Sequence, residues 1–240
     1  MPGNPTLSQN TFTEAGRVVT SEAMTVQGTV NKTAILLALT AGAAAYTWHG
    51  QAALGSLWIV GALGGFIMAM VTVFKKEWSA VTAPIYAILE GLFIGGISSV
   101  FEQRYPGIVV QAVMLTFGTL AALLAAYTMG LIRASSGFRR GIFAATGGIA
   151  LLYLVSMVLS FFHIQIPLIF GSGPVGILFS IAVVIIAALN LVIDFDFIES
   201  GAQQGVPKYY EWYGAFSLMV TLIWLYMEIL RLLAKLNRRN

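Results

Sequence analysis

The sequence predicts an all-α integral membrane protein, a bundle of seven transmembrane helices. Hydrophobic residues make up 58% of the 240 residues and charged residues only 10%, whereas soluble domains carry about 25% charged residues. The mean hydropathy of the chain is +0.84. The apolar residues lie in seven stretches, most of them near the roughly 20 residues that a helix needs to cross the hydrocarbon.

Polar or basic segments flank the seven expected spans. Residues 1–30 are expected to form a polar tail with a short helix on the membrane surface, and residues 237–240 a basic tail. No basic segment with a short apolar core starts at Met1, so we expect no cleaved signal peptide. The membrane domain is expected over residues 31–236, with spans at Lys32–Trp48, Ala53–Phe74, Thr82–Phe101, Ile108–Leu131, Ile142–Phe162, Val175–Ile193 and Tyr213–Leu233.

The composition excludes several classes of function. The chain has no cysteine, which removes disulfides, thiolate catalysis, zinc ribbons and iron–sulfur clusters. The sequence pI is about 9.2, but the Lys and Arg residues lie at the ends of the spans, where they set topology and meet anionic lipid. We therefore expect the lipid bilayer as a partner and no nucleic acid.

The basic residues indicate an orientation. If all seven spans cross, the opposite loops carry only Arg104, and the positive-inside rule places the N-terminus in the cytoplasm. Residues 231–239, which are rich in basic side chains, would then lie outside. A re-entrant span would put nearly all basic residues on one side, so both topologies stay open. The basic residues on the N-terminal side are Arg17, Lys32, Lys75, Lys76, Arg133, Arg139, Arg140 and Lys208.

The third span contains one charge, Glu90, near its middle. At about 1.5 Å per helical residue, this carboxylate lies roughly 12 Å from either end of the span. A central acid costs about 2.5–3.5 kcal/mol to insert, so such residues face a bundle interior or a wet cavity and are candidates for function. We predict that Glu90 is a pH sensor or lines an ion path.

Small residues recur at helical spacing where neighbouring spans are expected to approach closely. They are Gly61 with Gly65, Gly91 with Gly95, and the pair Gly147 and Gly148. Without a hydrophobic driving force between helices in lipid, such positions allow backbone contact and dispersion packing.

The last span carries a polar stripe on an apolar helix. Its members recur at steps of four, three, four and three, which places them on one face. A polar face needs protein or water around it, which predicts a central position for this helix. Glu228 is a candidate for the ion path and Arg231 for a latch, although the two residues could simply pair near the interface. The stripe consists of Ser217, Thr221, Trp224, Glu228 and Arg231.

The sixth span ends in a group of oxygen ligands. Asn190 and Asp194 are four residues apart and share a helical face, while Asp196 points elsewhere if the helix continues. Acids at a helix end beside a membrane path can coordinate calcium weakly and briefly, so Asp194 and Asp196 are candidate ligands. A solvated acidic loop is the alternative.

Three segments together resemble the bacterial branch of the transmembrane Bax inhibitor motif family, the Bax inhibitor-one-like proteins. They are YAILEGLFIGGIS in the third span, VIDFDFIE at the end of the sixth, and AFSLMVTLIWLYMEILRLL in the seventh. The resemblance covers residues 32–236 through the order and spacing of these segments. It implies a central last helix wrapped by two groups of three helices, and a pH-sensitive calcium leak.

The resemblance also implies roles for single residues. In the family, two aspartates on helices six and seven form a pair whose protonation is linked to opening and closing. Asp194 matches the first, but Thr221 occupies the second position and cannot ionise, so the coupled pair is incomplete. A displaced pair of Glu90 with Asp194 or Asp196 stays open. The basic residues that can latch the family's pair correspond to Lys75 and Lys76.

The sequence gives little support for an enzymatic function. His49 and His163 lie in short loops without an HExxH spacing, and the GSG at residues 171–173 predicts a turn. A retinal Schiff base needs an intramembrane lysine, and the seventh span has none before Lys235. We expect no enzymatic activity and no cofactor.

These features predict a pH-sensitive calcium leak in the bacterial inner membrane. Ionised Glu90 is expected to favour a hydrated, cation-permissive bundle, and neutral Glu90 a closed one. A proton-coupled secondary transporter in which Glu90 carries the proton is one alternative. The other is a non-conducting regulatory protein that binds a protease or another integral membrane partner.

Overall fold

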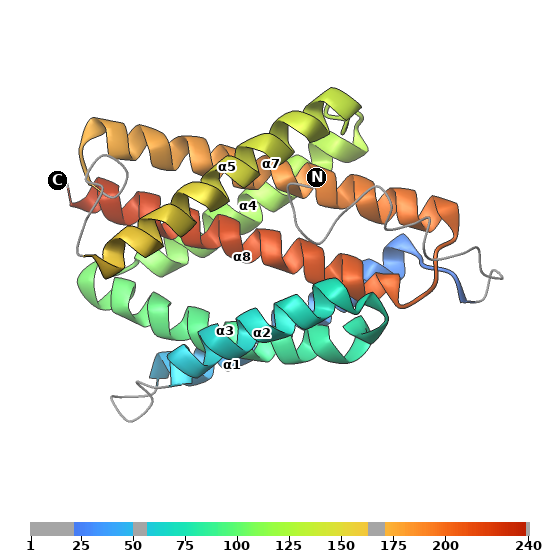
Figure 1. Ribbon diagram of the computed structural model, residues 1–240, viewed down its shortest axis with the longest axis horizontal. Helices are drawn as coiled ribbons and strands as arrows, with labels where there is room; N and C mark the ends of the chain where they lie inside the picture. Colours follow the sequence, from blue (N-terminus) through green and yellow to red (C-terminus); the bar gives the residue numbers. More distant parts are fainter. Residues whose placement is uncertain (1–21, 50–56, 163–170, 239–240) are drawn as a thin grey trace. The chain divides into compact units, whose positions relative to one another are not determined.

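The protein is helical throughout its described parts. A computed structural model describes residues 22–49, 57–162 and 171–238, and in these ranges seven α-helices and one short 3₁₀ helix follow one another (Figure 1). The elements are α1 (Val26–His49), α2 (Leu57–Phe74), the 3₁₀ helix η4 (Lys76–Trp78), α3 (Ser79–Arg104), α4 (Ile108–Thr128), α5 (Ser136–Phe161), α7 (Pro174–Gln204) and α8 (Tyr210–Asn237).

The predicted all-α membrane fold is confirmed. Six of the described helices, α2, α3, α4, α5, α7 and α8, are long and apolar enough to cross a membrane. With 24 residues, α1 is also long enough, but its first turns contain Gln27, Asn31 and Lys32, which lower its hydropathy. The seven predicted spans correspond to these seven helices.

Several boundaries differ from the prediction. α1 begins at Val26, so residues 26–30 belong to the first helix and not to the polar tail, whose residues 1–21 lie outside the described ranges. α7 continues past Ile193 to Gln204, which makes the acidic segment helical and overturns the alternative of a solvated loop there. The predicted start of the second span, Ala53, and His163 lie outside the described residues.

Glycines end two of the helices through the same motif. After α7, Gly205 adopts a φ of 65°, its N–H donates to Ala202, and the next N–H, of Val206, donates to Gly201. After α4, Gly130 adopts a φ of 73° and ends the helix with the corresponding bonds. This Schellman motif satisfies the last carbonyls of a helix and needs a left-handed residue, which glycine adopts without strain.

The described residues fall into two compact units, and each contains part of the last helix. One, the α1–α3 unit, comprises residues 22–104 and 196–220. The other, the α4–α7 unit, comprises residues 105–195 and 221–238. One unit thus contains α1 to α3 with the last turns of α7 and the first part of α8, and the other contains α4, α5, most of α7 and the rest of α8.

Within the α1–α3 unit, α3 packs against α1 and α2 through glycines. A Cβ on Gly61 of α2 would lie 2.8 Å from the backbone nitrogen of Phe93 on α3, and one on Gly95 of α3 would lie 2.7 Å from the Cα of Ala44 on α1. The expected close approach is thus confirmed at these glycines. It is wrong for Gly147 and Gly148, because a Cβ on either would meet no atom within 4 Å.

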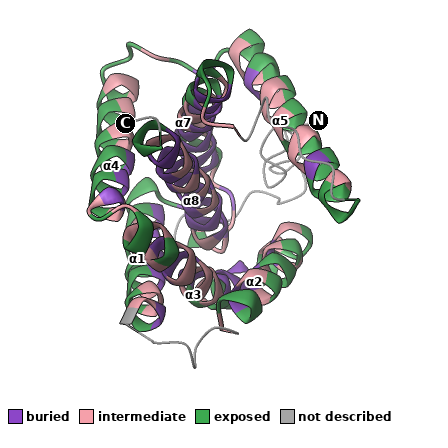
Figure 2. Ribbon diagram, turned by 90° about the vertical axis from the view of Figure 1, so that its left-hand side faces the viewer, coloured by how far each residue is buried: buried purple, intermediate pink, exposed green. Residues whose placement is uncertain are grey.

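The last helix is the most buried of the six membrane-spanning candidates (Figure 2). Large side chains such as Tyr213, Phe216 and Leu225 are completely enclosed. Of the polar stripe, Ser217, Thr221 and Glu228 are buried, whereas Trp224 and Arg231 are half-buried. The prediction that protein surrounds this polar face is therefore confirmed for the three buried residues.

Candidate functional site

Glu90 lies near the middle of the 26-residue α3, over the glycine-rich face of α2. A Cβ on Gly65 would stand 2.9 Å from its Oε2 atom, so a larger residue at position 65 would make this carboxylate shift. The side chain is neither fully buried nor fully exposed. Among the described residues, no hydrogen bond or ion pair involves Glu90, which leaves an intramembrane acid without a fixed partner.

Aromatic side chains connect the surroundings of Glu90 to the last helix. Tyr86, one turn before Glu90 on α3, is buried and packs edge-to-face on Phe216 of α8, with ring centroids 5.0 Å apart. Thr40 of α1 donates to the carbonyl of Ala87 on α3 at 3.1 Å. These contacts join α3 to both α1 and α8 within the α1–α3 unit.

In the α4–α7 unit, Asn190 and Asp194 are buried on one face of α7, as predicted. The Nδ2 of Asn190 donates to Thr146 Oγ1 at 2.9 Å and to the carbonyl of Ile186 at 2.8 Å. Its Oδ1 atom is buried and accepts no hydrogen bond from a described residue. α7 thus presents an amide oxygen and a carboxylate one turn apart.

Asp196 does not share that face. Because α7 is continuous here, two residues turn the side chain by about 200° around the helix axis, and Asp196 is half-buried whereas Asp194 is buried. The two predicted calcium ligands therefore point to different sides of α7. No group of three or more His, Cys, Asp or Glu side chains suited to a metal ion occurs in the described parts of the chain.

Toward the C-terminal end of α8, Glu228 and Arg231 form a hydrogen-bonded cluster with Tyr153 of α5. Arg231 NH1 lies 2.8 Å from Glu228 Oε1 and donates to the Tyr153 hydroxyl at 2.7 Å, while that hydroxyl donates to Glu228 Oε1 at 2.9 Å. The simple pairing of Glu228 with Arg231 is therefore what the structure contains. Tyr153 on α5 is a member that the sequence did not indicate.

The remaining predicted residues are Thr221, Lys75 and Lys76. Thr221 is buried in α8, and its hydroxyl cannot titrate. Lys75 and Lys76 lie at the turn between α2 and α3, where Lys75 is exposed and Lys76 half-buried. Lys235, beyond the stripe, is buried and donates to Ser180 Oγ at 2.8 Å.

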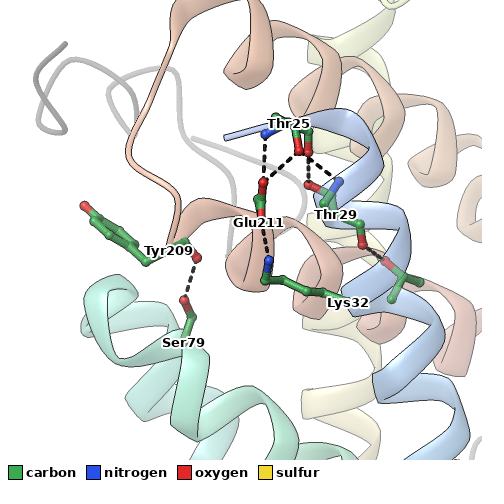
Figure 3. A network of polar contacts seen from close by, with 8 residues as sticks. Thr25, Thr29, Lys32, Ser79, Tyr209 and Glu211 are labelled. Carbon is green, nitrogen blue, oxygen red and sulfur yellow. Dashed lines mark hydrogen bonds and ion pairs between the residues drawn. The ribbon is translucent and has the colours of Figure 1, made fainter. Parts of the chain in front are cut away.

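The sequence did not indicate the role of another buried acid on α8, Glu211 in its first turn (Figure 3). Glu211 is 1% exposed and forms an ion pair with Lys32 of α1. Its Oε1 atom accepts bonds from the N–H of Thr25 at 3.0 Å and from the hydroxyl of Thr25 at 2.8 Å. An acid in the first turn of a helix is ordinarily explained by its favourable interaction with the helix dipole. The sequence around Glu211 therefore did not indicate that Lys32 is its partner.

Comparison with known proteins gives one finding. A family model described as Bax inhibitor 1 like matches residues 4–238, nearly the whole chain. No curated protein and no solved structure gives a significant match.

Proposed function

Because the chain belongs to the Bax inhibitor 1 like family, we propose that it is a pH-sensitive leak for calcium, gated by protonation of intramembrane carboxylates. The observation that carries this proposal is Glu90, an acid near the middle of a membrane-spanning helix with no hydrogen-bonding or ionic partner among the described residues. A structural acid at that depth is normally paired. An acid without a partner is available to a proton or a passing cation.

The chemistry of the two protonation states explains how Glu90 would gate. An ionised carboxylate near the bilayer centre needs water or a cation around it, because hydrocarbon does not solvate charge. A protonated carboxyl tolerates dry packing over Gly65 of α2. Ionisation therefore favours a wetter α2–α3 interface that admits cations, and protonation favours its closure.

Asp194 is the second residue of the proposed path. Its carboxylate and the amide oxygen of Asn190 lie one turn apart on a buried face of α7, and oxygen atoms are the ligands that calcium prefers. We propose that Asp194 contributes to calcium selectivity. Since Thr221 cannot ionise, Asp194 acts without the family's second aspartate.

The decisive experiment is calcium flux into liposomes that contain the purified protein, scanned across pH. We expect the wild-type flux to depend on pH and Glu90→Gln to lose most of that dependence, because glutamine cannot exchange the proton. Glu77→Gln is the matched control, since it removes the same charge from an exposed position just before α3. If Glu90→Gln titrates like the wild type, another group is the sensor.

A companion variant, Asp194→Asn, tests the selectivity role. We expect a lower preference for calcium over monovalent cations, or an altered resting leak. If neither quantity changes, Asp194 has a structural role only. An absence of calcium flux in the wild type at every pH would overturn the leak itself.

A proton-coupled transporter is the second candidate, because an acid without a fixed partner is also suited to carry a proton. Flux that saturates with substrate and is accompanied by proton movement would favour it over a leak. If no transport of any kind is found, a regulatory protein that binds a protease or another integral membrane partner takes its place.

The membrane and the orientation are part of the proposal. The bacterial inner membrane is proposed from the resemblance of the sequence to the bacterial branch of the family, and the distribution of Lys and Arg supports a cytoplasmic N-terminus. Labelling of single cysteines introduced before α1 and after α8 would test the orientation, since the chain has no cysteine of its own.

A further inference from the structure

We propose that residues 22–32 form a clasp that holds the first turn of α8, and that release of this clasp increases the leak. The clasp would regulate the function proposed above, so its flux test rests on that function. All of its contacts lie within the α1–α3 unit.

The clasp begins with backbone pairing between the N-terminal segment and the turn that joins α7 to α8. The N–H of Met24 donates to Val206 at 2.7 Å and the N–H of Lys208 donates to Glu22 at 2.8 Å, which makes Ala23 and Pro207 antiparallel partners. This pattern places those two residues in a non-hydrogen-bonded pair. Proline fits there because its missing N–H is not needed.

Side chains complete the clasp around Glu211 (Figure 3). Thr25 binds one carboxylate oxygen through its N–H and its hydroxyl, and Lys32 binds the other. The Lys32 ammonium also lies 5.5 Å from the centre of the Trp212 ring. A charge as deeply buried as Glu211 is stable only while its partners stay in place.

Gly28 makes this close fit possible. Its N–H donates to the Thr25 hydroxyl at 2.9 Å, which caps the start of α1. A Cβ at this position would coincide with the carboxylate of Glu211. Any side chain at position 28 therefore competes directly with Glu211 for the same space.

The clasp reaches the surroundings of Glu90 through α8. Only four residues separate Glu211 from Phe216 on this helix, and Phe216 packs on Tyr86, one turn before Glu90. The hydroxyl of Ser79 also anchors this turn, because it donates to the carbonyl of Tyr209 at 2.9 Å. When the clasp opens, the first turn of α8 can move about this anchor and change the packing around Tyr86.

The test uses one releasing change with a matched control and one locking change. Gly28→Ala should release the clasp, whereas Gly42→Ala adds the same methyl to the same helix in open space. Glu211→Gln is a second releasing variant that keeps the size of the side chain. Since the chain has no cysteine, the double variant Ala23→Cys with Pro207→Cys can form a single disulfide, for which the roughly 4.5 Å between Cα atoms of such a pair is suitable.

Two readouts separate the clasp from the leak. Hydrogen exchange of the amides of residues 206 and 208–211 reports the clasp without any flux, and we expect faster exchange in Gly28→Ala and Glu211→Gln than in Gly42→Ala. Calcium flux into liposomes reports regulation. Here we expect about a tenfold rise in the releasing variants, which corresponds to about 1.4 kcal/mol, and a fall in the oxidised cysteine pair that reductant reverses.

Each failure has its own meaning. Equal exchange in Gly28→Ala and Gly42→Ala would overturn the clasp itself. Faster exchange with unchanged flux, in liposomes whose wild-type protein conducts, would overturn its regulatory role. A wild type that passes no calcium at any pH would overturn the proposed leak and with it the regulation, while the exchange data would still decide whether the clasp exists.

Discussion

The contact between α1 and α3 allows the stability cost of a single substitution, Gly91→Ala, to be worked out from interatomic distances. Gly91 on α3 faces the backbone of α1, and a Cβ added there would lie 2.8 Å from the Cβ of Ala43 and 3.0 Å from the Cα of Thr40. The backbone oxygen of Thr40 is nearer still. Because these atoms belong to a helix backbone and a short side chain, they cannot rotate away from the new methyl of Gly91→Ala.

The cost of Gly91→Ala follows from these distances. Carbon atoms are in favourable contact at about 3.5–4.0 Å, so α1 and α3 must separate by about 1 Å. Overpacking of this kind costs about 1–3 kcal/mol. The separation also stretches the hydrogen bond from Thr40 to Ala87, now 3.1 Å, which is worth about 1 kcal/mol. The better helix propensity of alanine returns up to about 1 kcal/mol, which leaves a net loss of about 2 kcal/mol.

The measurement is the free energy of unfolding in detergent micelles, obtained by titration with a denaturing detergent and followed by tryptophan fluorescence. Gly42→Ala is the control, because a Cβ at Gly42 meets nothing within 4 Å. We expect Gly91→Ala to be about 2 kcal/mol less stable than Gly42→Ala.

Equal stability of the two variants would refute the reasoning, since it would mean that the helices relax apart without cost. A loss shared by both variants would point to a general effect of alanine in these helices and not to the α1–α3 contact.

Two further predictions concern single hydroxyl groups. Tyr153→Phe removes the group that bridges Glu228 and Arg231 and should lower the free energy of unfolding by about 1–3 kcal/mol, whereas the exposed Tyr46→Phe should not; equal values would show that the Tyr153 hydroxyl adds nothing. Thr40→Val removes the bond to α3 and should cost about 1 kcal/mol, more than Thr33→Val, whose hydroxyl bonds only the carbonyl of Thr29 in its own helix. If Thr33→Val is the more damaging of the two, the interhelical bond does not stabilise the protein.

Features that depend on one helix at a time could be predicted from the sequence. The apolar spans follow from length and composition, because hydrocarbon requires a helix of about 20 apolar residues. The polar stripe on the last helix is a matter of helical period, and its members Ser217, Thr221 and Glu228 are indeed buried. The position of Glu90 near the middle of its span follows from the number of residues between it and either end of the span.

Partners across helices could not be predicted in the same way. Lys32 and Glu211 are 179 residues apart, and Tyr153 and Glu228 are 75 apart. A helix presents each side chain at a known angle about its own axis, but the sequence does not specify the rotation and depth at which two helices meet. Glu211 therefore had several possible cationic partners, and only the packed structure selected Lys32.

The sequence by itself determined the class of protein, the number of helices and the acid at the centre of α3, because each follows from local composition and the helical period. The tertiary structure decided that Glu90 lies over Gly65 and that the N-terminal segment binds Glu211 beside Gly28. Those outcomes depend on close approach of backbones at glycine, which is decided by how all the helices pack at once.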